Sequence, residues 1–444
     1  MSIKAGIGQV DISPRKGTEL GGYPYFARHN TGIHDPLIAA GLYLEVESKR
    51  VLFLATDLFY LTKRQATDFR QAIADEINLQ PQEILISCSH THSAPWVNPM
   101  FSSMTEDSSY EPDVDEAYVE FVKEQLIKLA KNTLAEPFEA ELGFGMAFCG
   151  KDEGVGGNRR DPENGISDPS LPLLAVRNLE GELLALHTKY AVHPTILHGE
   201  NTLVSADYPG AVRRIINESY PETTFMFSMG AAGDQSPRYF RSSQTFEEVD
   251  RFGRSIGKSI LNAMDKIEYS RNVSLELTSK EMELIMKDYS EPDAIQQKLD
   301  NLRNKEQSLI EADAPYTEQQ TANLWVLGAE CELKNAKLHA QGKLVPKFEE
   351  SSPVEAAVLK LDKRAYVFLQ GEIFMDFAKQ IEDLSPFEET VVITLANGEL
   401  PGYLVTGEAL EIGGYEPGNS LLDPKSGEIV ISTVRSLLND AYKK

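Results

Sequence analysis

The sequence predicts an α/β fold of sheets flanked by helices, with a helical hairpin inserted late in the chain. Short apolar runs of strand length alternate with amphipathic segments of helical period. Between residues 288 and 343 the composition shifts to Gln, Glu, Lys, Leu and Ala, and Ala314-Pro315 breaks this stretch in two, which is typical of two helices joined by a turn. A chain of 444 residues exceeds the usual size of one core, so we expect a main domain with an excursion.

The expected elements begin with strands and turns in residues 1–60, including a hairpin in which Leu42–Glu47 and Val51–Thr56 flank the charged turn Ser48-Lys49-Arg50. Amphipathic helices are expected at 64–77, 115–134, 208–219 and 243–268, with strands between 138 and 193. After residue 354, strand and turn signals continue to about 432. We therefore predict a catalytic domain of residues 1–287 and 346–444 and a helical insertion of residues 288–345.

The charge balance excludes some classes of partner. Asp and Glu number 68 against 43 Lys and Arg, a net charge of −25, which argues against nucleic acids and anionic membrane surfaces because both require basic patches. No apolar run of membrane-spanning length occurs, and the first residues lack the apolar core of a signal peptide. Cys88, Cys149 and Cys331 are too sparse for a disulfide framework. We expect a cytoplasmic protein with a small-molecule partner and no membrane anchor, either monomeric or a homo-oligomer.

Five expected strands each lead directly into a polar motif. In sheets flanked by helices, ligands bind beyond the strand ends, where the loops converge, so these motifs are predicted to meet in one site. The strand and motif pairs are Val51–Thr56 with Asp57, Glu83–Cys88 with SHTH at 89–92, Leu183–Val192 with HPT at 193–195, Thr224–Met229 with GAAGDQSP at 230–237, and Ala365–Gln370 with Gly371-Glu372.

Three histidines and one carboxylate within these motifs are candidates for a metal site. His90 and His92 are two residues apart, so on an extended segment both face the same side, although one could cap a turn and the other pack in the core. His193 precedes Pro194 after an apolar strand and is either a ligand or a core histidine. Glu372 is costly at such a position unless it is paired or metal-bound. Two or three imidazoles with one carboxylate are typical of a catalytic zinc site with an open position.

Two further residues have competing interpretations. Ser236 lies in GDQSP, which is not the nucleophile elbow of α/β-hydrolases, and serine in such a turn is more often a cap. Arg159 lies in the Gly-rich stretch GVGGNRR. An arginine there can polarise a carbonyl or bind an anion, but it can equally be part of a solvated basic turn.

In order along the chain, these motifs resemble those of the neutral, non-lysosomal ceramidases. The similar segments are SHTHSAP at 89–95, Asn158-Arg159, AVHPT at 191–195, SADYPG at 205–210, GDQSP at 233–237, Gly371-Glu372, and the stretch from Tyr403 to Tyr415-Glu416. The resemblance implies a layered α-β-β-α catalytic domain and one Zn²⁺ per chain, bound by His90, His193, Glu372 and Tyr403. It also implies that His92, Arg159, Ser236 and Tyr415 line the scissile bond.

The implied function is hydrolysis of a linear amide (N-acyl) bond by metal-activated water, in which Ser236 either orients the water or is the nucleophile. The alternatives are an esterase or a small N-acyl amidase with the same site, or a catalytically silent lipid- or carbohydrate-binding relative. We expect a short member of the family, without the C-terminal immunoglobulin-like domain of secreted members. Charged residues replace apolar ones after Asn158-Arg159, which favours a small, water-soluble substrate over ceramide, with Arg160 or a neighbour contacting a polar or anionic group.

Overall fold

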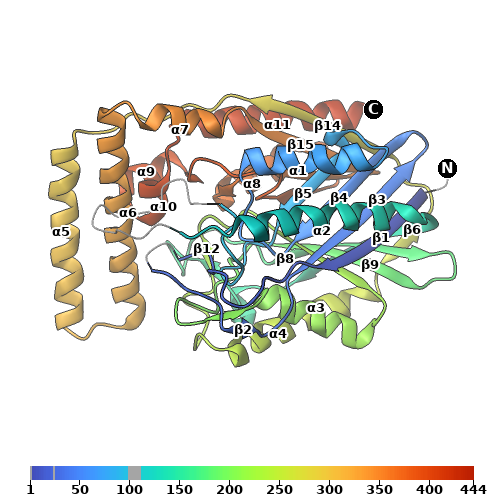
Figure 1. Ribbon diagram of the computed structural model, residues 1–444, viewed down its shortest axis with the longest axis horizontal. Helices are drawn as coiled ribbons and strands as arrows, with labels where there is room; N and C mark the ends of the chain where they lie inside the picture. Colours follow the sequence, from blue (N-terminus) through green and yellow to red (C-terminus); the bar gives the residue numbers. More distant parts are fainter. Residues whose placement is uncertain (1–2, 24–25, 99–111) are drawn as a thin grey trace.

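Two β-sheets lie face to face, and helices cover both outer faces, in the computed structural model, which describes residues 3–23, 26–98 and 112–444 (Figure 1). The predicted α-β-β-α layering is therefore confirmed. Each sheet is apolar on both faces, because one face packs on helices and the other on the opposite sheet. In β4, for example, Leu52 and Leu54 face the helices while Val51, Phe53 and Ala55 face the second sheet.

The larger sheet has the strand order β11-β9-β8-β6-β1-β3-β4-β5, with β13 paired to β6. Most neighbours are antiparallel, but β4 with β5 and β9 with β11 are parallel pairs, so within each pair the two following loops emerge at the same end of the strands. The strands are β1 (Ile3–Asp11), β3 (Ile38–Val46), β4 (Lys49–Thr56), β5 (Ile84–Cys88), β6 (Phe138–Phe148), β8 (Ser170–Asn178), β9 (Leu183–Tyr190), β11 (Thr224–Met229) and β13 (Glu268–Ser270).

The smaller sheet has the order β14-β15-β16-β18, and β16 and β18 form a parallel pair. Its inner face packs on the larger sheet, and the rings of Phe53 and Phe368 meet edge to face across this interface with centroids 5.2 Å apart. The strands are β14 (Leu275–Met282), β15 (Val354–Leu361), β16 (Arg364–Leu369) and β18 (Glu389–Ile393).

Short two-residue strands tie the connecting loops together. Three pairs occur among the described residues, and two of them join segments that the motifs singled out. The pairs are β2 (Gly32–Ile33) with β10 (Leu203–Val204), β7 (Gly157–Asn158) with β12 (Gln235–Ser236), and β17 (Glu372–Ile373) with β19 (Tyr403–Leu404).

Amphipathic helices supply the outer layers. Four of them bury apolar side chains on the larger sheet: α1 (Lys63–Glu76), α2 (Glu116–Ala135), α3 (Tyr208–Ser219) and α4 (Phe246–Met264). Two cover the smaller sheet: α8 (Met375–Leu384) and α11 (Lys425–Lys443). The loops also contain two 3₁₀ turns, η1 (Pro81–Glu83) and η2 (Lys151–Glu153), and short helices such as α9 (Gly407–Ile412). Within the described ranges, no helix is long and apolar enough to cross a bilayer.

At one end of the molecule, α5 (Pro292–Glu311) and α6 (Tyr316–Ala340) stand beside the layers, while both chain termini lie at the opposite end (Figure 1). The break at Ala314-Pro315 is confirmed, because α5 ends before it and Pro315 is the N-cap of α6. A short helix not expected from the sequence, α7 (Leu344–Glu350), follows. The division into a catalytic domain and an insertion of residues 288–345 stays a prediction.

The expectation of strands and turns from 354 to about residue 432 is wrong at α8 and at the C-terminal segment, which is the helix α11. Its buried residues Val430, Val434, Leu437 and Leu438 recur at intervals of three and four, which is the helical period. The β-branched residues in EIVISTV resemble a strand locally, but the uncovered outer face of the smaller sheet selects the helix. The hairpin turn also lies slightly earlier than expected. The first strand ends at Val46 and the second begins at Lys49, and Glu47 in the turn has a φ of 56°.

Glycine lets α6 approach α10 (Tyr415–Asn419) with backbone against backbone. A Cβ added at Gly328 would collide with the carbonyl oxygen of Gly414, and one added at Gly418 would collide with that of Gly328. This contact sets the position of Tyr415 relative to α6.

Replacing Gly328 with Ala should force α6 and α10 apart. We expect a loss of about 1–3 kcal/mol in the free energy of unfolding, which is typical of overpacking, and a lower midpoint of thermal unfolding. Gly407→Ala is a matched control, because the nearest atom to its added Cβ is 3.8 Å away. Equal midpoints for the two variants would contradict the proposed close packing.

Candidate metal centre and adjoining cavity

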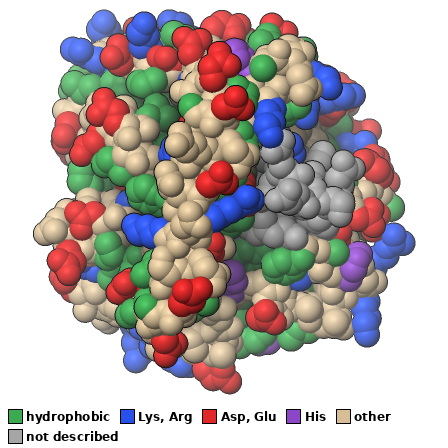
Figure 2. Space-filling model, turned by 90° about the vertical axis from the view of Figure 1, so that its left-hand side faces the viewer, with side chains coloured by type: hydrophobic (Ala, Val, Ile, Leu, Met, Phe, Trp, Pro, Cys, Tyr) green, Lys and Arg blue, Asp and Glu red, His purple; other side chains and the backbone are tan. Residues whose placement is uncertain are grey.

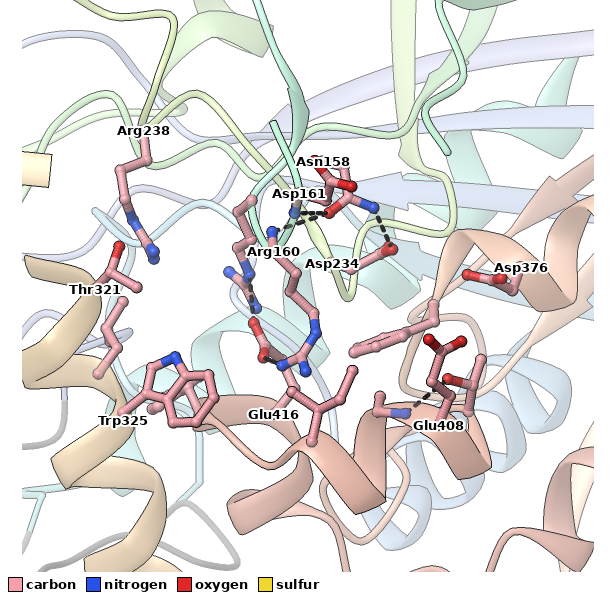
Figure 3. Close-up of a pocket in the computed structure, with 17 residues that line it drawn as sticks. Asn158, Arg160, Asp161, Asp234, Arg238, Thr321, Trp325, Asp376, Glu408 and Glu416 are labelled. Atoms are coloured by element: carbon pink, nitrogen blue, oxygen red, sulfur yellow. Dashed lines mark hydrogen bonds and ion pairs between the residues drawn. The ribbon is translucent and has the colours of Figure 1, made fainter. Parts of the chain in front are cut away.

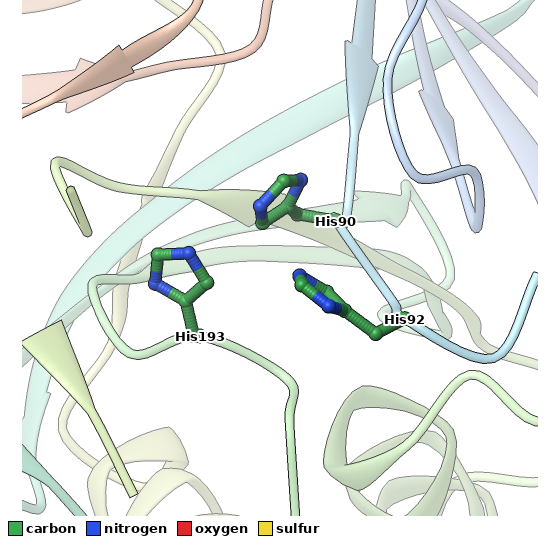
Figure 4. A group of neighbouring side chains, drawn as sticks. All are labelled: His90, His92 and His193. Atoms are coloured by element: carbon green, nitrogen blue, oxygen red, sulfur yellow. The ribbon is translucent and has the colours of Figure 1, made fainter. Parts of the chain in front are cut away.

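Three histidines from two strand-end loops form one cluster (Figure 4). His90 and His92 follow β5 and His193 follows β9, and one ring nitrogen of each lies within 4.8 Å of the others. His90 has a φ of 67°, in the left-handed region that non-glycine residues seldom adopt, and its ring stacks on Phe59 with centroids 4.5 Å apart. Backbone strain of this kind is often found at functional sites.

Backbone carbonyls determine which ring nitrogens are free. His90 Nδ1 lies 2.9 Å from the oxygen of Phe59, and His193 Nδ1 lies 2.9 Å from the oxygen of Gln235. A carbonyl oxygen only accepts, so both Nδ1 atoms donate, and in the neutral form of each ring the Nε2 atom carries the lone pair. Metal-binding histidines are typically oriented in this way.

The carboxylate of Glu372 lies against these two lone pairs. Its Oε2 is 2.9 Å from His193 Nε2 and 3.4 Å from His90 Nε2. Burial, followed by the positive charge of Arg159, lowers the pKa of His193 to about 4, so the ring is neutral at neutral pH. Burial raises the pKa of Glu372, but His90 and His193 outweigh it and hold the pKa well below its usual value. Atoms this close are compatible when a metal ion lies among them, or when one Nε2 carries a proton and donates it to the carboxylate.

The residues present fit a divalent metal ion. His90 Nε2 and both ring nitrogens of His92 are buried, and the described residues offer them no hydrogen-bond partner. Buried polar atoms are rarely left unsatisfied, and neutral imidazoles with a carboxylate are the donor set that zinc and related metals prefer. His92, predicted to contact the substrate, lies within the same cluster as the predicted ligands.

Neighbouring elements fix the position of His92. Arg28 donates a hydrogen bond of 2.5 Å to the backbone oxygen of His92 and another of 2.5 Å to that of Gly21. A Cβ at Gly22, whose φ is 92°, would lie 2.5 Å from the ring of His92, so only glycine leaves room for the imidazole. Burial, together with the charge of neighbouring His90, lowers the pKa of His92 well below its usual value.

The fourth predicted ligand, Tyr403, is brought beside Glu372 by the parallel pair β17–β19, in which these two residues are in register. The ring of Tyr403 lies 6.2 Å from that of Tyr415 and 5.9 Å from the guanidinium carbon of Arg159. Burial, followed by the charge of Glu372, raises the pKa of Tyr403 well above its usual value, so without a metal the phenol stays protonated.

A cavity of about 430 Å³ opens beside the cluster, a size typical of small-molecule sites. Six of the eight predicted site residues line it: His92, Arg159, His193, Ser236, Tyr403 and Tyr415. The other two, His90 and Glu372, lie behind it in contact with His193. Asp57 does not join them, because its carboxylate is held 2.6 Å from Arg213 and accepts from the backbone of Ile38. Four of the five strand-end motifs therefore meet.

Comparisons with known proteins agree with this architecture. No family model matches the chain. A curated neutral ceramidase of Drosophila pseudoobscura pseudoobscura is 26% identical over 241 residues, which is 49% of this chain and 32% of that protein. The chain thus matches about a third of the length of this relative.

Two solved structures cover nearly the whole chain. Neutral ceramidase from Pseudomonas aeruginosa superposes with a TM-score of 0.73 at 15% identity, covering 99% of this chain and 75% of that one. A ceramidase complexed with C2 gives a TM-score of 0.73 at 14% identity, covering 100% and 76%. The chain has the fold of the neutral ceramidases. The resemblance predicted from the motifs is confirmed.

In this ceramidase fold, a buried ion triad of Arg159, Arg160 and Glu416 holds Arg159 between this cavity and a neighbouring one, whose lining Figure 3 draws. Glu416 accepts from Arg159 Nε at 2.7 Å and from Arg160 Nη1 at 2.8 Å. Burial raises the pKa of Glu416, but the two arginines outweigh it and lower the pKa below its usual value. Arg160 also donates to the oxygen of Gly413 at 2.9 Å. The charge of Arg160, predicted as a substrate contact, is therefore engaged within the protein.

The sequence patterns did not identify several further residues of this site. Glu416 directly follows Tyr415 in the Tyr403–Glu416 motif. A carboxylate in a motif of the same site as Arg159 and Arg160 was the signal that could have identified it. Asp234 links two loops: it accepts from Asn158 at 2.9 Å and from the backbone of Met375 at 3.0 Å. Five residues of α6 also line the cavity, and no local pattern identified them: Gln320, Asn323, Leu324, Leu327 and Glu330.

Replacing His193 with Ala should remove a metal donor. We expect metal affinity to fall by at least the roughly 10–100-fold that loss of an outer-shell partner costs, measured as bound divalent metal per chain by elemental mass spectrometry after dialysis. His29→Ala is the control, since His29 is exposed and away from the cluster. Full metal retention in the His193 variant would show that the cluster does not bind metal through this residue.

Replacing Glu416 with Gln should leave Arg159 and Arg160 buried without a counter-charge. We expect a loss of about 3–5 kcal/mol in the free energy of unfolding, as for other broken buried pairs, measured by chemical denaturation. Glu408→Gln, at an exposed residue of the neighbouring cavity, should leave stability unchanged. If both variants unfold alike, the triad does not stabilise the fold.

Proposed function

We propose that this chain is a zinc-dependent hydrolase that cleaves a linear amide bond in an N-acyl compound. The observation that carries the proposal is the buried cluster of His90, His92 and His193 beside a cavity lined by Arg159 and Ser236. The ceramidase fold and the sequence similarity to a protein named neutral ceramidase support the same class of reaction.

The proposed ligands of one zinc ion per chain are His90, His193, Glu372 and Tyr403. The support for this set is the pair of free Nε2 lone pairs, the carboxylate within 3.4 Å of both, and the register of Tyr403 with Glu372. When bound, zinc supplies a Lewis acid that polarises an acyl oxygen and lowers the pKa of a water molecule to about 7.

Arg159 and Tyr415 are proposed to stabilise the negative charge that develops on the amide oxygen. Arg159 uses Nε for Glu416 and donates from Nη2 to the oxygen of Gly233 at 2.6 Å. Of its five N–H groups, three remain for Tyr403 and the substrate. Because the triad holds the guanidinium in place, little reorganisation accompanies the reaction.

His92 is proposed to transfer a proton to the leaving amine. Its depressed pKa keeps the imidazole neutral, so it can take up a proton and pass it on. The reaction consumes one water: the amide C–N bond breaks, the water oxygen joins the acyl carbon, and a proton reaches the nitrogen. The products are a carboxylic acid and an amine.

Ser236 is proposed to orient the substrate or water rather than to act as a nucleophile. Its Oγ accepts a hydrogen bond of 3.1 Å from the backbone N–H of Arg238. Across the described segments, no imidazole or carboxylate lies within hydrogen-bond distance of this hydroxyl, and a serine nucleophile requires a base.

The substrate is proposed to be a small, water-soluble N-acyl compound. The test measures kcat/KM for N-acyl amides from acetyl to palmitoyl, with ceramide included, before and after chelation and after zinc is restored. We expect activity to disappear with the chelator and return with zinc, with shorter chains preferred over ceramide. Ser236→Ala should reduce kcat without abolishing it, and no acyl-enzyme should be found by intact mass spectrometry.

Other outcomes would reject parts of the proposal. Activity that survives complete zinc removal would exclude the zinc mechanism. A steady rise in kcat/KM up to palmitoyl, with ceramide as the best substrate, would exclude a small substrate. Turnover of matched esters but not amides would assign an esterase, and an acyl adduct on Ser236 would make that serine the nucleophile.

A further inference from the structure

The cavity beside the metal cluster is basic, although the chain is strongly acidic. The net charge is −25, and acidic and basic side chains are interspersed on the face that carries α5 and α6 (Figure 2). Among the described residues that line the cavity, three are arginines, Arg159, Arg238 and Arg241, and one is acidic, Glu330. Glu330 is already paired with Arg303 at 2.8 Å, so it neutralises none of the three.

The three arginines differ in what they contact. Arg159 is paired with Glu416. Arg241 donates to the backbone oxygens of Thr195 and Ile196. The guanidinium of Arg238 has neither a hydrogen bond nor an ion pair within the described parts of the chain, and Figure 3 draws no interaction to it.

Arg238 is charged at neutral pH. Burial, followed by the positive charge of Arg159, lowers its pKa to about 10, which is still far above neutrality. Its side chain is partly buried and lines the cavity, and no described residue supplies it with a counter-ion. Residues of this kind are typically retained where a ligand supplies the missing charge.

The position of Arg238 limits where an anion would bind. It lies between two cavities, because it also lines a second one of about 360 Å³. In the second cavity Glu416 is paired with Arg159 and Arg160, and four further carboxylates would repel an anion there: Asp161, Asp234, Asp376 and Glu408. The anion is therefore expected on the side of the metal cluster.

We infer that Arg238 binds the carboxylate of the substrate, and that the substrates of this chain are N-acyl amino acids. The inference rests on the proposed amide hydrolysis. In an N-acyl amino acid the carboxylate is attached to the carbon next to the amide nitrogen. In the protein, Arg238 is likewise next to the residue proposed to face the reacting amide, because the backbone N–H of Arg238 donates a hydrogen bond to Ser236.

Helix α6 completes the recognition of such a molecule. Gln320 and Asn323 offer polar groups to an amino-acid side chain, while Leu324 and Leu327 offer an apolar surface to the acyl chain. Cleavage breaks the amide C–N bond with one water and releases a carboxylic acid and a free amino acid, so no further reactant is needed.

The test compares the zinc-loaded wild type with Arg238→Gln on two matched amides, N-octanoyl-serine and N-octanoyl-serinol. The two amides are identical except that serinol carries a hydroxymethyl group where serine carries its carboxylate. We expect wild type to prefer the serine compound by about 10–100-fold in kcat/KM, the range of a hydrogen bond to a charged group, mainly through KM. The variant should lose most of this ratio, Arg238→Lys should retain part of it, and Arg254→Gln, at an exposed position of α4, should keep all of it.

The outcomes separate this inference from the proposed function. If both amides are cleaved but wild type prefers serinol, or Arg238→Gln leaves the ratio unchanged, the inference is wrong and amide hydrolysis stands. If neither amide is cleaved, the proposed function fails, and calorimetric titration with N-octanoyl-serine decides the inference. Binding that is lost in Arg238→Gln and kept in Arg254→Gln supports the carboxylate site, and equal binding by all three proteins overturns it.

Discussion

The carboxylate of Glu372 meets two imidazole rings in the interior of the protein. Its Oε2 lies 2.9 Å from His193 Nε2 and 3.4 Å from His90 Nε2. The backbone occupies the opposite nitrogen of each ring, so neither imidazole can rotate to offer a donor instead. The arrangement is favourable with a metal ion among these atoms, or with a proton on one Nε2 that donates to the carboxylate. The loops after β5, β9 and β16, which carry these residues, are thereby linked in one place.

A second set of buried charges holds the substrate side of the site. Glu416 neutralises Arg159 and Arg160, and Asp234 connects the loop of Asn158 to the start of α8, next to Glu372. Both carboxylates link segments that are far apart in sequence. The same contacts that stabilise the fold therefore hold a rigid guanidinium beside the histidine cluster.

The periodic patterns were reliable wherever one local signal determined the outcome. The strands before the motifs and the helix at Tyr208–Ser219 lie where the apolar spacing indicated. Residues 425–443 did not follow their strand-like composition, because the outer face of the smaller sheet required a covering helix. In the same way, Arg160 was predicted to contact a polar or anionic group of the substrate, but its charge is engaged by Glu416, a residue 256 positions away.

The order and chemistry of the motifs alone determined the resemblance, the fold class and the eight candidate site residues, because ligand types and strand-end positions are local properties of a sequence. Tertiary structure decided which of them share a cavity, which ring nitrogens lack a hydrogen-bond partner among the described residues, and that His92 lies within the histidine cluster. It also left Arg238 without a counter-charge while pairing Arg159, and it brought α6 to the cavity through glycine contacts with α10. These features depend on packing between distant segments, and neither periodicity nor motif spacing carries information about such packing.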